Sequence, residues 1–402
     1  MKFEEIKKID DELIMHTYKR FPIALDHGSG AALWDIAGKR YIDLNAGIGV
    51  SCLGHAHPAL VQAVSEQAGK LLHVSNLYYT EPLERTAEKL IGASAGVGMK
   101  RVFFANSGAE ANEGMLKIAR KYAAKTFSPA RHKVLSLKQS FHGRTIATLK
   151  ATGQKRFHRQ FGPFPEGFDY VEPNNLEDLK AHADETVCAL LLELVQGESG
   201  VCPLDSSYVR EAERFCRERG ILLLIDEVQT GVGRTGTFLT SEQYGIRPDL
   251  ISLAKGLGGG VPIGAVLAGE SCCDVLEPGD HGTTFGGNAL AASAACAVLD
   301  IVAEPEFLKE VTEKGSYFMD ALRHLKTDRI QEVRGMGLMI GIEVPETELA
   351  ADIGALMKNG VLPITAGSNV IRLLPPLVIN YVEIDAAMAA FRRVFEKDGL
   401  CG

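Results

Sequence analysis

The chain has 402 residues, of which 23% are charged, and a formal net charge of −8. A chain of this length is expected to form two or three domains with a sizeable core, and its composition is typical of globular proteins. The mild acidity argues against a nucleic-acid partner, because such partners require a basic surface.

The first residues, MKFEEI, are charged and lack the apolar segment of a secretion signal. No apolar run approaches the roughly 20 residues of a membrane span. The eight cysteines show no CxxC spacing, which is typical of reduced, structural cysteines. We therefore expect a cytoplasmic protein without a membrane partner.

The first 66 residues contain no core of their own, so we expect them to join a small domain with the C-terminal part. Within them, His55-Ala56-His57-Pro58 invites a metal-site hypothesis. Two alternate histidines without a matched third ligand are weak evidence for a metal, and a turn before a helix is the favoured interpretation. We predict no bound metal.

Short apolar runs alternate with helical stretches from about Lys100 to Ala268. They occupy residues 101–104, 133–137, 187–192, 221–225, 250–253 and 263–268. This alternation predicts a large domain over 67–287, with a mostly parallel sheet covered by helices on both faces. From 288 to 402, an alanine-rich helix, short strands and a closing helix predict a smaller α+β domain, which the segment 1–66 joins.

A tight turn follows the first of these strands. In Asn106-Ser107-Gly108-Ala109, free backbone N–H groups, a serine hydroxyl and a glycine meet at the start of a helical stretch. A plain N-cap explains such a turn as well. Because the turn lies at a carboxyl end in the same predicted sheet as Lys255, we favour a phosphate-binding site.

Aromatic and charged residues follow the next strands. Phe141 can stack on a planar ring, and Arg144 can bind a carboxylate through two hydrogen bonds. Glu193 and Glu198 follow a further strand, where a substrate contact and a solvated loop charge are both open interpretations.

Asp226 and Lys255 each follow a buried apolar run. Open α/β sheets bind their ligands at the carboxyl ends of the strands, so we expect both residues at that edge. One chemistry needs both a lysine that forms a Schiff base and a carboxylate that keeps a pyridinium nitrogen protonated. The sequence therefore predicts a site for pyridoxal 5'-phosphate.

The segment Gly231-Val232-Gly233-Arg234-Thr235-Gly236 matches GxGxxG, so a nicotinamide-dependent dehydrogenase is a competing hypothesis. The dinucleotide fingerprint needs an immediate turn after the strand, whereas residues 226–230 intervene here. No second strand ends in an acid about 20 residues further on. We therefore disfavour the dehydrogenase.

Together these segments resemble the class III pyridoxal-phosphate aminotransferases, which have the aspartate-aminotransferase-like fold, known as fold type I. The resemblance runs from about Tyr18 to Arg393 and implies a homodimer with a shared active site. It rests on GHAHP at 54–58, NSGAEAN at 106–112, FHGR at 141–144, QGE at 196–198, DEVQ at 226–229, SLAKGLGGG at 252–260 and HGTTFGGN at 281–288.

This resemblance implies roles for individual residues. Lys255 is the Schiff-base lysine and Asp226 the partner of the pyridine nitrogen. The other cofactor-binding residues implied are Ser107, Gly108, Ala109 (where a threonine is common), Phe141, Glu227, Val228, Gln229 and, from the neighbouring subunit, Thr284. The substrate-binding residues implied are Arg144 for the α-carboxylate of the donor, Arg372 for a carboxylate of 2-oxoglutarate, and Glu198, which masks Arg372 during the other half-reaction. Tyr18, Ile48 and Thr283 complete the set.

The resemblance also implies a reaction. The terminal amino group of N2-acetyl-L-ornithine passes to 2-oxoglutarate, giving N-acetylglutamate 5-semialdehyde and glutamate in arginine biosynthesis. Ile48 favours an acylated donor, because family members that act on free ornithine commonly have a tyrosine there. N-succinylornithine and N-succinyl-diaminopimelate stay open as donors, and ornithine and 4-aminobutyrate are less favoured. A non-catalytic regulator of the same fold is the rival hypothesis, and the full set of substrate residues argues against it.

Overall fold

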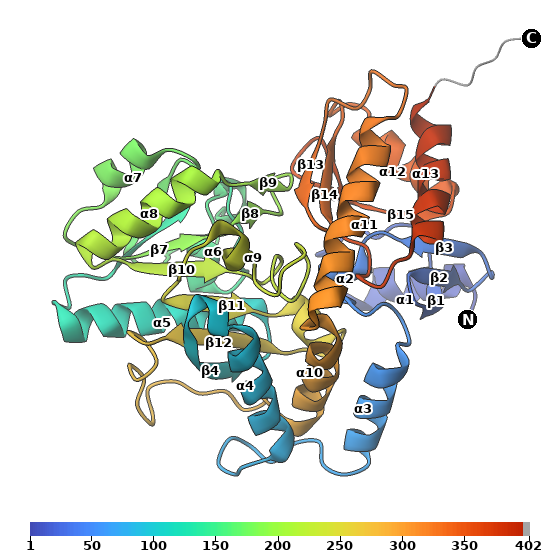
Figure 1. Ribbon diagram of the computed structural model, residues 1–402. Coiled ribbons are helices and arrows are strands. Elements are labelled where there is room, and N and C mark those ends of the chain that lie inside the picture. Colours follow the sequence, from blue (N-terminus) through green and yellow to red (C-terminus); the bar gives the residue numbers. More distant parts are fainter. Residues whose placement is uncertain (397–402) are drawn as a thin grey trace, which may run out of the picture.

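A seven-stranded sheet lies at the centre of the computed structural model, which describes residues 1–396 (Figure 1). In sheet order its strands are β4 (Met99–Ala105), β12 (Gly264–Gly269), β11 (Leu250–Leu253), β10 (Leu222–Asp226), β7 (Val187–Leu192), β5 (Lys133–Leu137) and β6 (Phe168–Val171). All neighbours are parallel except those of β12, which runs antiparallel to β11 and β4. The predicted α/β fold with a mostly parallel sheet is confirmed.

Both faces of this sheet are buried, which explains why its strands are continuous apolar runs. Along β7, Leu190 and Leu192 pack into one core cluster, whereas Ala189 and Leu191 pack into another. The helices and short 3-10 turns of this lobe are α4 (Glu81–Ala93), η1 (Ala95–Val97), α5 (Gly108–Thr126), α6 (Ile146–Ala151), η2 (Lys155–Phe157), α7 (Leu176–His182), α8 (Ser206–Arg219), α9 (Thr240–Tyr244) and η3 (Lys255–Gly258). A two-stranded hairpin, β8 (Val195–Gln196) and β9 (Cys202–Pro203), completes it.

The C-terminal part of the chain forms a second lobe, at the right of Figure 1. Its antiparallel sheet has the order β13 (Glu332–Met336), β14 (Met339–Glu343), β17 (Val370–Leu373) and β16 (Ile364–Ala366). Its helices are α10 (Ala289–Val302), α11 (Pro305–Arg323), α12 (Leu349–Lys358) and α13 (Tyr381–Phe395).

The N-terminal segment pairs with this C-terminal part. Strands β1 (Leu25–Ser29), β2 (Ala32–Asp35) and β3 (Arg40–Asp43) are antiparallel, and β15 (Val361–Leu362) adds to them parallel to β3. The helices of the segment are α1 (Phe3–Leu13), α2 (Ala46–Gly49) and α3 (Pro58–Ala68). The domain limits at residues 66 and 287 stay a prediction.

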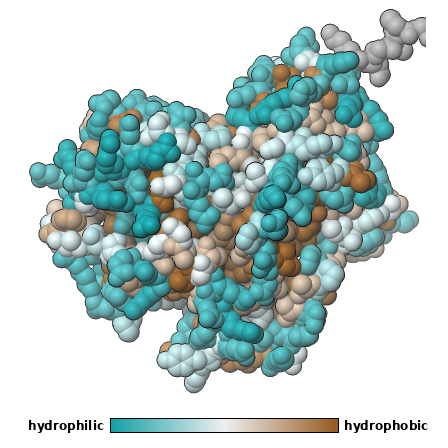
Figure 2. All heavy atoms as spheres, viewed as in Figure 1, coloured by the Kyte–Doolittle hydropathy of each residue, from teal (hydrophilic) through white to brown (hydrophobic). Residues whose placement is uncertain are grey.

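The surface differs between the lobes and the region that joins them. On the face shown in Figure 2, both lobes are mainly hydrophilic, and hydrophobic residues gather in the lower middle of the molecule, around α10. Within residues 1–396, no helix combines the length and the apolar character that a membrane crossing requires.

Candidate active site

A cavity of about 460 Å³ lies where β10 and β11 end. Its walls come from these two strand ends, the start of α5, and the loops that follow β5 and η3. It is lined by Val50, Asn106, Ser107, Gly108, Ala109, Asn112, Phe141, His142, Gly143, Arg144, Glu193, Asp226, Val228, Gln229, Ala254, Lys255, Gly260, Val261, Pro262 and Ile263. The parallel strands therefore bring Asp226 and Lys255 into one cavity.

The Asp226 carboxylate is buried and held by four groups. Its Oδ2 accepts a hydrogen bond from Asn112 Nδ2 at 2.7 Å and lies 2.8 Å from His142 Nδ1. Its Oδ1 accepts from the backbone N–H of Val228 at 3.0 Å and from Ser252 Oγ at 3.3 Å. These hydrogen bonds fix the orientation of the carboxylate.

Asn112 and His142 had not been predicted as site residues. Asn112 lies four residues after Gly108 on α5, so both face the same side of the helix, and this spacing is the signal that could have identified it. His142 belongs to the FHGR motif, and its other ring nitrogen, Nε2, is buried without a hydrogen-bond partner among residues 1–396.

Lys255 lies two residues after the end of β11, at the start of η3, and its backbone adopts φ +41°. Burial lowers the pKa of its ammonium group, and the negative charges of Glu198 and Asp226 oppose this shift. A lysine with a lowered pKa supplies the neutral amine that a nucleophile needs.

The start of α5 forms another wall. Ser107 is its N-cap and accepts a hydrogen bond from the N–H of Glu110 at 3.2 Å. A Cβ on Gly108 would lie 2.6 Å from Val228 Cγ1, so only glycine leaves room here. The first N–H groups of a helix lack intrahelical acceptors and bind anions, so this wall suits a phosphate.

Arg372 lies behind this cavity, on β17, and its side chain is 1% exposed. Its Nη1 donates to Glu198 Oε1 at 2.7 Å and to Gln229 Oε1 at 3.1 Å. Its Nε is buried without a partner in the part of the chain that the structure describes. Burial alone would raise the pKa of Glu198, but Arg372 outweighs this effect and holds the pKa below its usual value.

Arg144 is an exposed cation on the cavity wall. Its guanidinium carbon lies 5.5 Å from the ring centre of Phe141 and 4.1 Å from that of Phe157. No ion pair among residues 1–396 involves Arg144, so its guanidinium remains available for a carboxylate.

Glu193 contributes a buried carboxyl group to the wall, with 5% of the residue exposed. Its Oε2 accepts a hydrogen bond from the N–H of Phe141 at 2.7 Å, which fixes the loop that carries this ring. Burial raises the pKa of Glu193 to about 7, although His142 opposes the shift.

The side chain of Glu227, which directly follows Asp226, is not among those that line the cavity. Its two oxygens accept from the N–H groups of Thr240 and Ser241 and from the hydroxyls of Thr230 and Ser241, at 2.8–3.0 Å. The carboxylate therefore caps the start of α9, and the cofactor contact of Glu227 stays a prediction.

Glu198, which pairs with Arg372, and four other predicted residues are not among those that line this cavity. Thr283 and Thr284 line a neighbouring hollow of about 410 Å³, which shares only Asn106 with the cavity. Tyr18 is 76% exposed, and Ile48, near Val50 of the wall, is 39% exposed. Their roles in binding stay predictions, and that of Thr284 requires a second subunit.

The two competing motifs have structural roles. His55 Nε2 lies 2.8 Å from Asp43 Oδ2, and residues 1–396 contain no group of three His, Cys, Asp or Glu that could hold a metal ion. In the GxGxxG segment, the buried Arg234 donates to the carbonyls of Leu338 and Pro375, at 2.9 and 2.6 Å, and so ties the two lobes together.

The residues of the cavity fit pyridoxal phosphate. An anchored carboxylate faces a lysine at the neighbouring strand end, a helix N-terminus suits the phosphate, and Phe141 and Val228 supply apolar surfaces for a flat ring. The glycine at position 108, where a Cβ would clash with Val228, brings the backbone close to that surface.

The comparisons with known proteins agree with this geometry. Acetylornithine aminotransferases are 47% identical in Haemophilus ducreyi, over 99% of this chain and 100% of the relative, and 46% identical in Caldanaerobacter subterraneus, over 94% and 96%. The crystal structure of ornithine aminotransferase from Toxoplasma gondii superposes with a TM-score of 0.94 at 33% identity, covering 98% of this chain and 95% of that one.

N-acetylornithine aminotransferase from Stenotrophomonas maltophilia superposes with a TM-score of 0.82 at 36% identity, covering 94% of this chain and 96% of that one. The ornithine aminotransferase of Toxoplasma gondii has also been solved with partial occupancy of pyridoxal phosphate at its active site. The model of the family "Aminotransferase class-III" matches residues 13–395. This chain belongs to the class III aminotransferases.

Proposed function

We propose that N2-acetyl-L-ornithine is the amino donor of this pyridoxal-phosphate-dependent aminotransferase and 2-oxoglutarate its acceptor. The products are then N-acetylglutamate 5-semialdehyde and glutamate. The observation that carries the proposal is the single cavity in which Lys255 and the anchored Asp226 lie beside Arg144, with Arg372 held behind Glu198. Relatives at 43–47% identity that are named acetylornithine aminotransferases support it.

When bound, pyridoxal phosphate supplies a pyridinium ring that accepts the electrons of the broken C–H bond. Asp226 keeps the ring nitrogen protonated, while Asn112 and His142 hold the carboxylate in place. Ser107 and the first N–H groups of α5 bind the phosphate. The Lys255 amine, whose pKa is lowered by burial, holds and returns the proton of the reacting carbon.

Each substrate places a carboxylate on a different arginine. A donor that reacts at its terminal amine carries no carboxylate on the reacting carbon, so its α-carboxylate pairs with Arg144 and not with Arg372. During that half-reaction Glu198 neutralises Arg372. When 2-oxoglutarate binds, a carboxylate replaces Glu198 on Arg372, whose Nε has no other partner among the described residues.

The nature of the donor follows from the region around Ile48. An apolar side chain there gives a charged α-ammonium group no partner, whereas an acyl amide keeps this nitrogen neutral. We expect N-acetylornithine to exceed ornithine by more than about tenfold in kcat/KM, since about 1.4 kcal/mol gives that factor.

Competition assays with N-acetylornithine, N-succinylornithine, N-succinyl-diaminopimelate, ornithine and 4-aminobutyrate test this choice. Equal or better use of free ornithine would overturn the assignment. A strong preference for either succinyl donor would replace the acetyl donor by that alternative.

A homodimer with a shared active site is part of the proposal. Large apolar side chains are exposed beside the hollow that holds Thr284, and they include Leu77, Tyr78, Tyr79 and Phe285 at 87, 68, 96 and 60% exposure. The segment that carries them is tied to the Thr283 loop, because Asn76 Nδ2 donates to the carbonyl of Gly286 at 3.0 Å. Such a patch is typical of an interface, and a second copy would bring its Thr284 towards the phosphate site.

A further inference from the structure

A second hollow, of about 470 Å³, opens beside the active site and plays no part in the reaction described above. It lies where the two lobes meet. Its lining residues are Gln139, Gln154, Lys155, Arg156, Ser199, Gly367, Ser368 and Asn369. The lining contains two cations and no carboxylate, although the chain as a whole has a net charge of −8.

The guanidinium of Arg156 is positioned in advance. Gln154 is 4% exposed, and its Nε2 donates to the carbonyls of Gln139 and Ser140 at 3.2 and 3.0 Å. The orientation of this amide is therefore fixed, and its Oε1 accepts from Arg156 Nη2 at 2.8 Å. A cation held in this way loses less side-chain freedom when it binds an anion.

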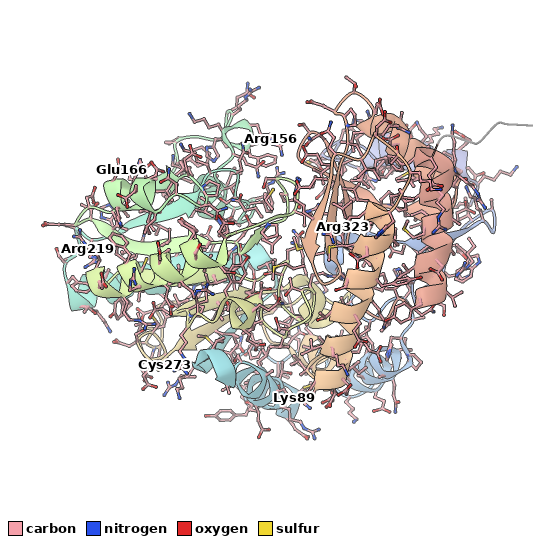
Figure 3. All side chains as sticks on the ribbon, turned by 45° about the horizontal axis from the view of Figure 1, so that its top comes forward. Lys89, Arg156, Glu166, Arg219, Cys273 and Arg323 are labelled. Atoms are coloured by element: carbon pink, nitrogen blue, oxygen red, sulfur yellow. The ribbon has the colours of Figure 1, made fainter. Side chains whose placement is uncertain are left out.

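The cations of this hollow lack acidic partners in the part of the chain that the structure describes. Among residues 1–396, neither Lys155 nor Arg156 forms an ion pair. Figure 3 shows Arg156 at the margin of the larger lobe, on the side that faces the second lobe. The hydroxyl of Ser199 is buried and has no hydrogen-bond partner in the described residues, so it adds a free donor.

The hollow is connected to the two parts of the active site that carry Arg144 and Glu198. The guanidinium carbon of Arg156 lies 4.7 Å from the ring centre of Phe157, and that of Arg144 lies 4.1 Å from the same centre. Ser199 directly follows Glu198, whose carbonyl accepts from the N–H of Gly367 at 2.9 Å. One phenyl ring therefore joins the cation of the cavity to the cation of the hollow.

We propose that this hollow is a carboxylate-binding subsite, in which Lys155 and Arg156 pair with the anion and Ser199 donates a hydrogen bond. The proposal deepens the proposed function and rests on it. With the α-carboxylate of a donor on Arg144, the far carboxylate of a dicarboxylic N-acyl group reaches Arg156 past Phe157. A free dicarboxylate has the same chemistry and is the other source of the ligand.

Kinetics with two donors test whether the hollow binds the carboxylate of a donor's N-acyl group. Arg156→Gln is expected to lower kcat/KM for N-succinyl-L-ornithine about five- to tenfold and to change that for N-acetyl-L-ornithine less than twofold, because only the succinyl group carries the second carboxylate. Lys155→Gln is expected to lower kcat/KM for N-succinyl-L-ornithine by a smaller factor, because the ammonium group of Lys155 is not held in place. Arg159→Gln is the matched control, since Arg159 is an exposed cation of the same loop that does not line the hollow.

Calorimetric titration of succinate into the holoenzyme tests whether the hollow binds a free dicarboxylate. Binding that is lost in Arg156→Gln and kept in Arg159→Gln, with an unchanged ratio of the two donors, assigns the subsite to a free anion. An unchanged donor ratio in Arg156→Gln together with unchanged succinate binding overturns the proposal. A wild-type enzyme that uses neither acyl donor contradicts the proposed function instead, and the titration still decides whether the hollow binds a carboxylate.

Discussion

At the scale of single residues, the chemistry of the cavity depends on one lysine. Lys255 is the only lysine among the residues that line it, so no neighbour in the described chain can replace its amine. This isolation makes the proposed role of Lys255 open to a direct test.

We expect Lys255→Ala to lower kcat by at least about a thousandfold, because a positioned proton-transfer group contributes about 10²–10⁴-fold and the nucleophile is lost as well. Steady-state assays with N-acetylornithine measure the loss, and an unchanged far-ultraviolet circular dichroism spectrum shows that the fold is intact. Near-normal turnover in this variant would end the assignment of Lys255.

Glu193 gives a prediction for the pH dependence of stability. Burial raises the pKa of its carboxyl from 4.5 to about 7, so the folded protein binds this proton more tightly than the unfolded chain does. Stability is therefore lost as the pH rises from about 4.5 to about 7, and the penalty is constant above that.

Glu193→Gln removes this penalty and keeps an acceptor for the N–H of Phe141. The variant is expected to gain about 2 kcal/mol of unfolding free energy relative to the wild type between pH 5 and pH 8. Urea unfolding at both pH values measures the gain, and the exposed Glu185→Gln serves as the control. A difference between variant and wild type that does not change with pH contradicts a raised pKa.

At the scale of elements, the five-residue helix α9 depends on Glu227. Four donors converge on this carboxylate, and the residue is fully buried. Glu227→Ala leaves these donors unpaired, so we expect a loss of about 2–4 kcal/mol of unfolding free energy. Thermal or urea unfolding measures it, with Glu211→Ala, an exposed glutamate of α8, as the control. A loss no larger than that of the control would show that α9 does not need this cap.

Most strands of the central sheet could be predicted because both faces are buried and the apolar runs are continuous. The runs at 133–137, 187–192 and 250–253 coincide with β5, β7 and β11. The edge strand β6 was not predicted, since its sequence Phe-Asp-Tyr-Val is short, half-buried and carries a charge. The reversed direction of β12 was not predicted either, because an apolar run does not encode the direction of its strand.

The site could be predicted only in part. Asp226 and Lys255 follow from the rule that ligands bind at strand ends, and both line the cavity. The resemblance alone supplied Arg372 and its pairing with Glu198, because the sequence separation of the two residues hides the contact between them. The cap that Glu227 provides for α9 was not predicted, because neighbouring residues at a strand end point in different directions.

At the scale of the whole molecule, the exposed apolar patch around Tyr79 predicts a dimer. Tyr79→Asp places a charge on that patch, so we expect it to shift the protein towards monomers at micromolar concentration and to lower activity at least about tenfold, because the partner's phosphate contact is lost. Sedimentation velocity and assays over a dilution series measure both effects.

The matched control for this variant is Val382→Asp, which charges an apolar residue of α13 that is 77% exposed and lies on the second lobe. It is expected to leave both the assembly and the activity unchanged. A wild-type protein that is monomeric and fully active at high dilution would refute the shared active site.

The pairing of β3 with β15 links the completion of the fold to the timing of its synthesis. At about 5–20 residues per second, a ribosome needs roughly 15–60 s to extend the chain from the end of β3 to the start of β15. Throughout this interval the open edge of β3 presents unpaired N–H and C=O groups. On a polysome, this edge is therefore open to mispairing with a neighbouring nascent chain until the distant strand β15 has been made.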